Sequence, residues 1–146
     1  IMTNSHYIDA YKKTQQSTNS VTSSHEIVRT LMKELVNSMQ KIVLDIQDER
    51  KRKQNQFSVD KEFEEKNARH KSKNLSKSLS IIYGLQTSLD FDKALEIANN
   101  LFQLYEYCRH ELIKGFSSKI EDGIIKAIDV INQIIEGWEE IPSLEK

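Results

Sequence analysis

The side chains that could carry chemistry in this chain are four histidines, one cysteine and scattered carboxylates. A di-iron bundle needs Glu-x-x-His pairs that face one another from two helices, and no Glu-x-x-His occurs here. No two histidines have the spacing of ligands to one metal ion; they are His6, His25, His70 and His110. The single cysteine, Cys108, excludes an intramolecular disulfide and an all-cysteine metal site. We therefore expect no metal, no cofactor and no catalytic residue.

Two patterns bear on phosphate chemistry. No two glycines lie closer than eight residues, so there is no glycine-rich loop to cradle a phosphate. His110 is followed by Lys114 and Gly115, which is similar to the phosphorelay histidine of four-helix phosphotransfer domains. In that family the lysine and the glycine each come one residue earlier, and this offset turns the lysine by about 100° around a helix. Histidine phosphotransfer through His110 is kept as an alternative function.

The composition points to helices. The chain has 146 residues with one proline and four glycines, too few turn residues for a β-sandwich or barrel. Charged residues make up 29% and apolar residues 38%, which is typical of amphipathic helices in one domain. The net charge of −1 provides no overall field for nucleic acid or anionic lipid. Apolar runs reach only three residues, so we expect no membrane insertion and a cytoplasmic protein.

Apolar residues at steps of three and four predict four long helices. The first begins at the capping box Ser23-x-x-Glu26, and its core stripe is Ile27, Leu31, Leu35, Met39, Ile42, Val43 and Ile46. The second is expected over about residues 59–88. The third is expected to be capped by Asp90 and stopped by Gly115, and the fourth to run over about 118–141. Short joins make the fold all-α, an antiparallel up-and-down four-helix bundle over residues 23–141.

The chain ends and the region 48–70 are more polar than the rest of the sequence and carry few apolar residues at helical spacing. Residues 1–22 are polar, and we expect a mobile N-terminal segment that is helical or extended; residues 142–146 form a C-terminal tail. In the N-terminal segment, Tyr7, Ile8 and Tyr11 would lie on one face of a helical turn. This turn is either a frayed terminus or a clip that docks two aromatic rings. The basic run within 48–53 is interpreted as a solvated helix end rather than a nucleic-acid patch.

The last two helices carry more apolar residues than a bundle core needs. A second line on the third helix comprises Phe91, Leu95, Phe102 and Ile113, and one on the fourth comprises Ile125, Val130, Ile134 and Ile141. A core-facing stripe needs only about 100° of each helix. The surplus indicates either a broad core or an exposed groove for a partner helix, and the pattern slightly favours the broad core.

Two stretches of the chain resemble a known family. They are Leu85-Gln86-Thr87-Ser88-Leu89-Asp90-Phe91 and Glu96-Ile97-Ala98-Asn99-Asn100-Leu101-Phe102-Gln103-Leu104-Tyr105-Glu106-Tyr107. They resemble the Ser-Leu-Asp turn and the following helix of the flagellin-specific export chaperones, the FliS family. The pair Tyr7-x-x-x-Tyr11 and the position of Trp138 are also similar to that family, so that the resemblance covers about residues 5–141.

This resemblance implies a cytosolic chaperone rather than an enzyme. Such a chaperone binds the C-terminal segment of flagellin, prevents premature polymerisation and brings flagellin to the flagellar type III export apparatus, without nucleotide or metal. The family-like motifs give as partner-binding residues Tyr7, Tyr11, Leu101, Leu104 and Tyr105. Supporting positions are Ile82, Leu85, Leu89 and Ile97. A helical protein-interaction scaffold, with weak self-association through the groove, is the other alternative.

Overall fold

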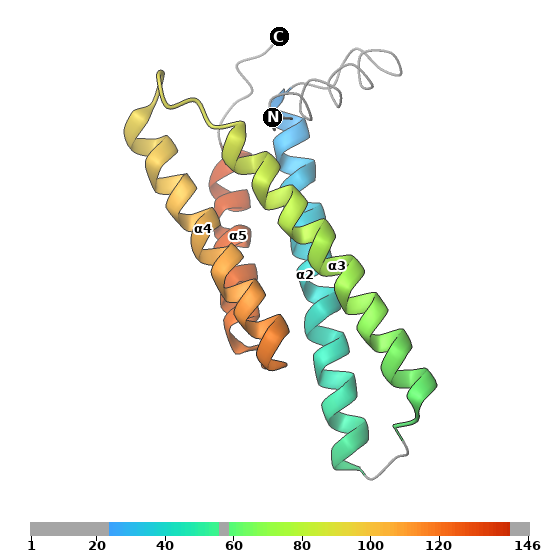
Figure 1. Ribbon diagram of the computed structural model, residues 1–146. Coiled ribbons are helices and arrows are strands. Elements are labelled where there is room, and N and C mark those ends of the chain that lie inside the picture. Colours follow the sequence, from blue (N-terminus) through green and yellow to red (C-terminus); the bar gives the residue numbers. More distant parts are fainter. Residues whose placement is uncertain (1–23, 56–58, 141–146) are drawn as a thin grey trace, which may run out of the picture.

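Four helices make up the fold of this chain in a computed structural model, which describes residues 24–55 and 59–140 (Figure 1). They are α2 (Ser24–Gln54), α3 (Lys61–Thr87), α4 (Leu95–Ser118) and α5 (Asp122–Glu140). Each helix packs against the next in the chain, and α5 packs back against α2. The described residues contain no strand. The prediction of an all-α, up-and-down four-helix bundle is confirmed.

Some expectations concern residues outside these ranges. They are the N-terminal segment 1–22 with Tyr7 and Tyr11, the cap at Ser23, and the tail 142–146. The proposed division of the chain at residues 22 and 141 therefore stays a prediction. Among the described helices, none is both long and apolar enough to cross a membrane.

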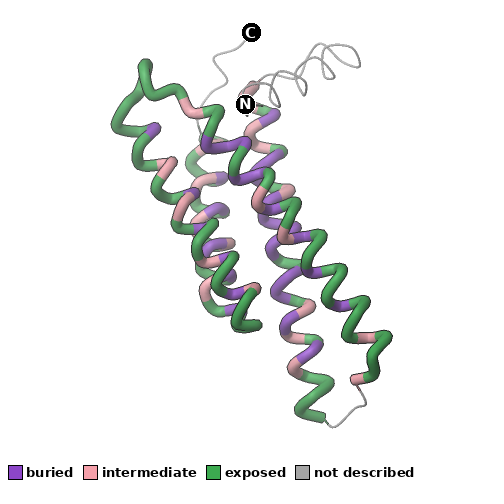
Figure 2. The backbone as a smooth tube through the Cα atoms, in the orientation of Figure 1, coloured by how far each residue is buried: buried purple, intermediate pink, exposed green. Residues whose placement is uncertain are grey.

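The core runs along the middle of the bundle, where the buried parts of the four helices face one another (Figure 2). Every residue of the stripe predicted for the first helix is buried: Ile27, Leu31, Leu35, Met39, Ile42, Val43 and Ile46. From α5 the core receives Ile124, Ala127, Ile131 and Ile135. These positions follow the helical period of three and four residues.

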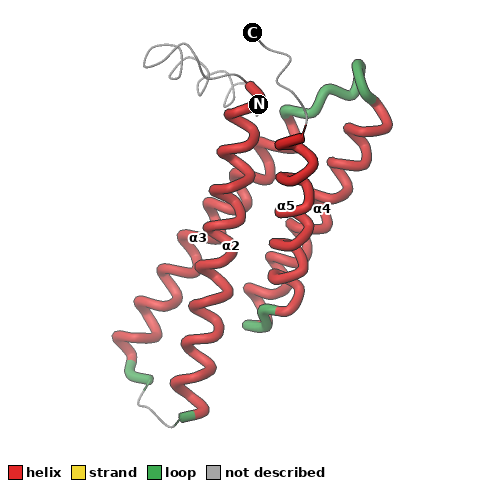
Figure 3. Tube along the Cα trace, turned by 180° about the vertical axis from the view of Figure 1, so that it is seen from behind, coloured by secondary structure: helices red, strands yellow, loops and turns green. Residues whose placement is uncertain are grey.

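The helices differ in length, and this difference shapes the molecule. α2 and α3 have 31 and 27 residues, whereas α4 and α5 have 24 and 19. The α2 and α3 ends therefore project past the turn that joins α4 to α5, as seen from both sides in Figures 1 and 3. We call this projection, residues 50–55 and 59–70, the α2–α3 arm. Phe63 of the arm lies under the Arg52 guanidinium, 4.2 Å from the ring centre.

The contact between α2 and α3 becomes polar towards the arm. The hydroxyls of Ser38 and Ser78 are hydrogen-bonded at 2.8 Å, and both side chains are buried. The Asn67 amide donates to the Asp45 carbonyl at 3.1 Å. Most of the described part of the stretch 48–70 is exposed as expected, but Glu49 and Asn67 are buried. Hydrogen bonds across the helix pair make that burial tolerable.

Three helix ends differ from the predictions: the start and the end of α4, and the start of α5, which lies at Asp122 rather than near residue 118. The Asp90 carboxylate accepts hydrogen bonds from the backbone N–H groups of Asp92 and Lys93, both at 3.0 Å. It therefore stabilises a turn, and α4 begins only at Leu95. Gly115 does not end this helix, which continues to Ser118. The end is made instead by Lys119 in the left-handed conformation, with φ of 58°.

Gly115 serves close packing instead. It is buried, and a Cβ placed there would lie 2.7 Å from the Ile120 carbonyl oxygen and 2.7 Å from the Ile124 side chain. A side chain at this position would push α4 away from the start of α5. The glycine therefore sets how closely the two helices approach at their turn.

Candidate functional site

Exposed apolar side chains gather on α4 and the loop before it. Six of the ten large apolar side chains that are exposed in the described ranges belong to this segment: Phe91, Leu95, Ile97, Leu104, Tyr107 and Ile113. Their exposed fractions run from 38% to 64%. We call these six residues the α4 apolar surface. Such a concentration on one element is typical of a binding surface rather than of scattered surface residues.

Part of the α4 apolar surface faces the side of α3. The Gln86 amide of α3 donates to the Phe102 carbonyl at 3.5 Å and to the Glu106 carboxylate at 2.8 Å. Leu95 lies seven residues before the half-buried Phe102 and therefore shares its side of the helix. The Phe91 ring packs edge-on against Phe102, with 6.2 Å between ring centres. These contacts give a partly covered aromatic and aliphatic strip.

The other part lies on the side of α5. The Cys108 thiol donates to the Ala127 carbonyl of α5 at 3.6 Å, which identifies the α5-facing side of α4. Leu104 is one turn before Cys108, and Ile97 is two turns before Leu104. Leu104 is 38% exposed and Ile97 64% exposed. α4 therefore presents apolar side chains on both flanks, with its buried face between them.

The slightly favoured prediction that the second apolar lines broaden the core is wrong for most of their members. Phe91, Leu95, Ile113 and Ile125 are all exposed. Only Phe102, Val130 and Ile134 are half-buried, and Ile141 lies outside the described residues. The physical reason is that α4 and α5 each already bury a full stripe, and four helices leave no further layer against which a second line could pack.

The structure divides the expected partner-binding residues into three groups. Ile82, Leu85 and Tyr105 are buried in the core, with exposed fractions of 0%, 1% and 3%. Leu89 and Leu101 are partly buried and pack against the core. The exposed ones are Ile97 and Leu104. Leu101 and Leu104 follow Ile97 along one flank of α4, so the structure brings these three together. Tyr7 and Tyr11 lie outside the described residues.

Tyr105 shows why a family-like aromatic can be inaccessible. Its hydroxyl donates to the Met32 sulfur of α2 at 4.0 Å, inside the core. Burial, with a smaller effect of nearby Cys108, raises the pKa of Tyr105 well above its usual value. A partner could reach this ring only if α4 moved away from α2.

Four members of the α4 apolar surface were not among the expected site residues: Phe91, Leu95, Tyr107 and Ile113. The sequence did contain a signal for three of them, because Phe91, Leu95 and Ile113 belong to the second apolar line. That line was interpreted as core. Tyr107 stands inside the family-like motif, but no periodicity distinguished it from its neighbours.

The described residues offer little for covalent chemistry. Burial raises the pKa of the Cys108 thiol to about 12, so it is a thiol and not a nucleophilic thiolate near neutral pH. Within residues 24–55 and 59–140, no group of three His, Cys, Asp or Glu side chains could hold a metal ion. His110 is exposed on α4, on the side of the helix away from the core. What the geometry presents is an exposed apolar surface.

Comparison with known proteins assigns the chain to a family. A family model described as "Flagellar protein FliS" matches residues 7–145. The flagellar secretion chaperone FliS of Vibrio cholerae serotype O1 is 27% identical over 136 residues, which are 92% of this chain and 88% of that protein. The protein of the same name from Salmonella typhimurium is 35% identical over 72 residues, 49% of this chain and 53% of that protein. No solved structure matches. Because the family match spans almost the whole sequence, the chain belongs to the FliS family of flagellar proteins.

Proposed function

We propose that this chain is a cytoplasmic export chaperone that binds the C-terminal segment of flagellin on the α4 apolar surface. Binding would keep flagellin from polymerising before the flagellar type III export apparatus receives it. The observation that carries the proposal is the gathering of six exposed apolar side chains on α4 and the loop before it, in a bundle that otherwise buries its core well. Membership of the FliS family, with relatives named flagellar secretion chaperones, supports it.

The chemistry of the surface suits an amphipathic client. Apolar side chains of a client helix can pack on either flank of α4, against Leu95 on one side and Ile97 and Leu104 on the other. Covering each half-exposed side chain contributes about 1 kcal/mol. A client that is disordered before binding loses conformational entropy, so contact over several such side chains is needed for tight binding. No bond is made or broken, and no catalytic group is needed.

The expected partner-binding residues then divide by role. Ile97, Leu101 and Leu104 are proposed as direct contacts on the α5 side, and Leu89 as a contact near the start of the surface. Ile82 and Leu85 of α3 and Tyr105 of α4 are proposed as supports, because all three are buried in the core. Tyr7 and Tyr11 are proposed as further contacts on the strength of the family-like motif alone.

The test is calorimetric titration of the full chain with a synthetic peptide of the C-terminal segment of flagellin from the same organism. We expect one-to-one binding with a large negative heat-capacity change, which marks burial of apolar surface. Leu104→Asp should weaken the affinity at least about tenfold, since a charge replaces an apolar contact. Leu44→Asp is the matched control, because Leu44 is 61% exposed on α2 and outside the α4 apolar surface.

Two results would contradict the proposal. One is the absence of binding while circular dichroism shows a folded chain and the peptide stays in solution. The other is equal loss of affinity in Leu104→Asp and Leu44→Asp, which would assign binding to another face or to charge alone.

A further inference from the structure

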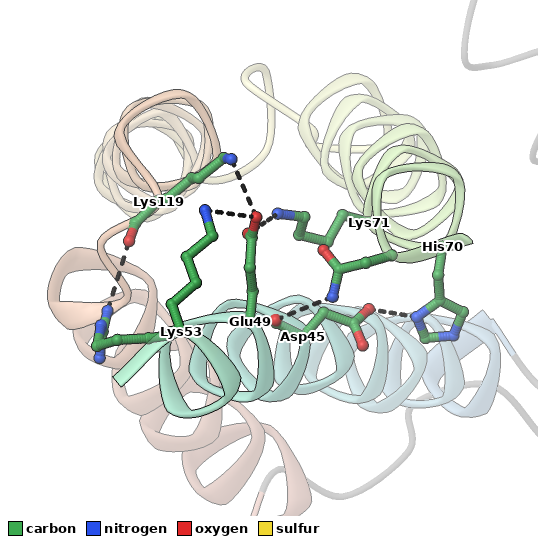
Figure 4. Close-up of polar contacts among 8 residues, drawn as sticks. Asp45, Glu49, Lys53, His70, Lys71 and Lys119 are labelled. Carbon is green, nitrogen blue, oxygen red and sulfur yellow. Dashed lines mark hydrogen bonds and ion pairs between the residues drawn. The ribbon is translucent and has the colours of Figure 1, made fainter. Parts of the chain in front are cut away.

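A cluster of charged side chains joins three parts of the fold at the base of the α2–α3 arm (Figure 4). Its centre is Glu49 of α2, which is only 7% exposed. The Glu49 carboxylate contacts the ammonium groups of Lys53, Lys71 and Lys119, each at 3.2 Å. These lysines come from α2, from α3 and from the α4–α5 turn. One buried carboxylate thus faces three positive charges, which leaves an excess of positive charge.

Two of the three lysines also face solvent. The side chains of Lys53 and Lys119 are 54% and 55% exposed, whereas that of Lys71 is 6% exposed. The ammonium groups of Lys53 and Lys119 contact the same Glu49 oxygen, Oε2, so they lie no farther apart than twice 3.2 Å. An ammonium group has three donors. Each lysine therefore keeps donors for an acceptor that arrives from solvent.

These two lysines border an open recess of about 320 Å³ beside the α4–α5 turn. It is lined by Ile46, Glu49, Arg50, Lys53, Gln54 and Lys119. The buried Ile46 gives one wall an apolar character. The recess therefore combines two exposed cations with one apolar wall.

The other charges nearby do not cancel this excess. Arg50 donates through Nη1 to the Glu121 carboxylate at 2.8 Å and through Nη2 to both Glu121 and the Lys119 carbonyl. Asp122 also lies close enough to favour the charged form of Arg50. Arg50 is thus compensated by its own carboxylates. Around Glu49 three cations still face one anion, in a chain whose net charge is −1.

The protonation state of Glu49 fixes this balance. Burial acts to raise its pKa, but the hydrogen bonds from Lys71, Lys119 and Lys53 together lower it to about 2. Glu49 therefore stays ionised at neutral pH and already shows that a carboxylate fits among these lysines. A second carboxylate at the recess would approach the remaining donors of Lys53 and Lys119.

We propose that the recess is a second interaction surface, which binds an acidic segment of a partner protein. A Glu or Asp side chain of that segment bridges Lys53 and Lys119 at the recess. A peptide carboxylate fits better than a phosphate, because both terminal nitrogens of Arg50 are already engaged and leave no free guanidinium fork. This surface is separate from the α4 apolar surface.

The probe is a fluorescein-labelled peptide of sequence Glu-Leu-Glu-Glu-Leu-Glu, and the comparison peptide has Gln in place of every Glu. Fluorescence anisotropy with the full chain at low salt should show binding of the Glu peptide only, and added salt should weaken it. Lys53→Gln with Lys119→Gln should lower the affinity several-fold and at most about 25-fold, since each exposed ion pair contributes up to about fivefold. Lys71 is kept, so Glu49 retains its buried partner and the fold.

The matched control is Lys33→Gln with Lys77→Gln. These two lysines are exposed on other faces, paired with Glu139 and Glu34, and their loss changes the net charge equally. The proposal is overturned if neither peptide binds, if the Gln peptide binds equally, or if both double variants lose affinity equally. Competition by inorganic phosphate as strong as by the Glu peptide would also overturn it, in favour of a small-anion site. Leu104→Asp should leave this binding unchanged.

Discussion

His25 and Trp138 hold the first turn of α2 against the last turn of α5 by exchanging two hydrogen bonds. The Trp138 indole N–H donates to the His25 carbonyl at 3.0 Å, and His25 Nε2 is 2.9 Å from the Trp138 carbonyl. Since a carbonyl only accepts, Nε2 must carry the proton. The two rings stack, with centres 4.9 Å apart and planes 10° from parallel. This contact closes the bundle at the end opposite Glu49.

Replacing the indole tests how much this contact contributes. Trp138→Phe keeps an aromatic ring to stack but removes the donor to the His25 carbonyl. We expect the free energy of unfolding to fall by about 1 kcal/mol, and by about 2 kcal/mol or more in Trp138→Ala, which also loses packing. Urea unfolding followed by circular dichroism measures both. Equal stability of Trp138→Phe and the unaltered chain would show that the hydrogen bond contributes nothing.

The buried thiol of Cys108 provides a second test. Burial raises its pKa to about 12, and its exposed fraction is 0%. In the native chain at pH 8, a disulfide reagent should therefore react at least about 100-fold more slowly than in concentrated guanidinium chloride, because reaction waits for opening of the core. The absorbance of the released thiol follows both rates. Fast native labelling would place Cys108 in an accessible part of α4.

The pKa of Glu49 makes stability depend on pH in a defined direction. Its folded pKa of about 2 lies below the ordinary value of about 4.5 expected for an unfolded chain. The stability it contributes is therefore complete above pH 4.5 and is lost as the pH falls towards 2. Glu49→Gln should lower the free energy of unfolding by about 3 kcal/mol at pH 7, and this difference should shrink as the pH falls from 4.5 to 2.

The control for Glu49→Gln is Glu34→Gln. The Lys77 hydrogen bond lowers the pKa of Glu34 as well, but that pair is 45% and 46% exposed. Glu34→Gln should lower the free energy of unfolding by less than about 1 kcal/mol at any pH, because the pair is exposed. Hydrogen bonds from Arg50 lower the pKa of Glu121 to about 2, so it titrates in the same window in all variants and cancels in the comparison. If the loss of stability in Glu49→Gln did not change with pH, the lowered pKa of Glu49 would not contribute to the stability of the fold.

The fold was largely predictable from the sequence because core positions repeat at the helical period. The stripe from Ile27 to Ile46 is buried throughout. The pattern could not separate a core stripe from an exposed flank of the same helix. Ile97 and Leu104 match the period of the third helix but lie at the edge of its buried arc, where packing against α5 decides exposure. Periodicity indicates a direction around one helix, whereas exposure depends on how neighbouring helices cover it.

The candidate interaction residues were less predictable for a related reason. Glu49 and Lys119 are far apart in the sequence, and only the packing of the α4–α5 turn against α2 brings them to 3.2 Å. In the sequence Glu49 was one member of a charge run, interpreted as a solvated helix end. That interpretation holds for Lys51 and Arg52, which are exposed. It fails for Glu49, because contacts with α3 and with the α4–α5 turn bury its charge.

Alanine substitutions at two glycines should change the free energy of unfolding in opposite directions. At Gly115 a new Cβ would meet the Ile120 carbonyl oxygen at 2.7 Å, and because this atom is backbone the helices must separate. Gly115→Ala should therefore destabilise the fold by about 2 kcal/mol, despite the better helix propensity of alanine. At Gly137 nothing lies within 4 Å of the new Cβ, so Gly137→Ala should stabilise α5 by about 0.5–1 kcal/mol. Urea unfolding of both variants measures the two changes in the free energy of unfolding. If Gly115→Ala were also stabilising, the close approach of α4 to the α4–α5 turn would be wrong.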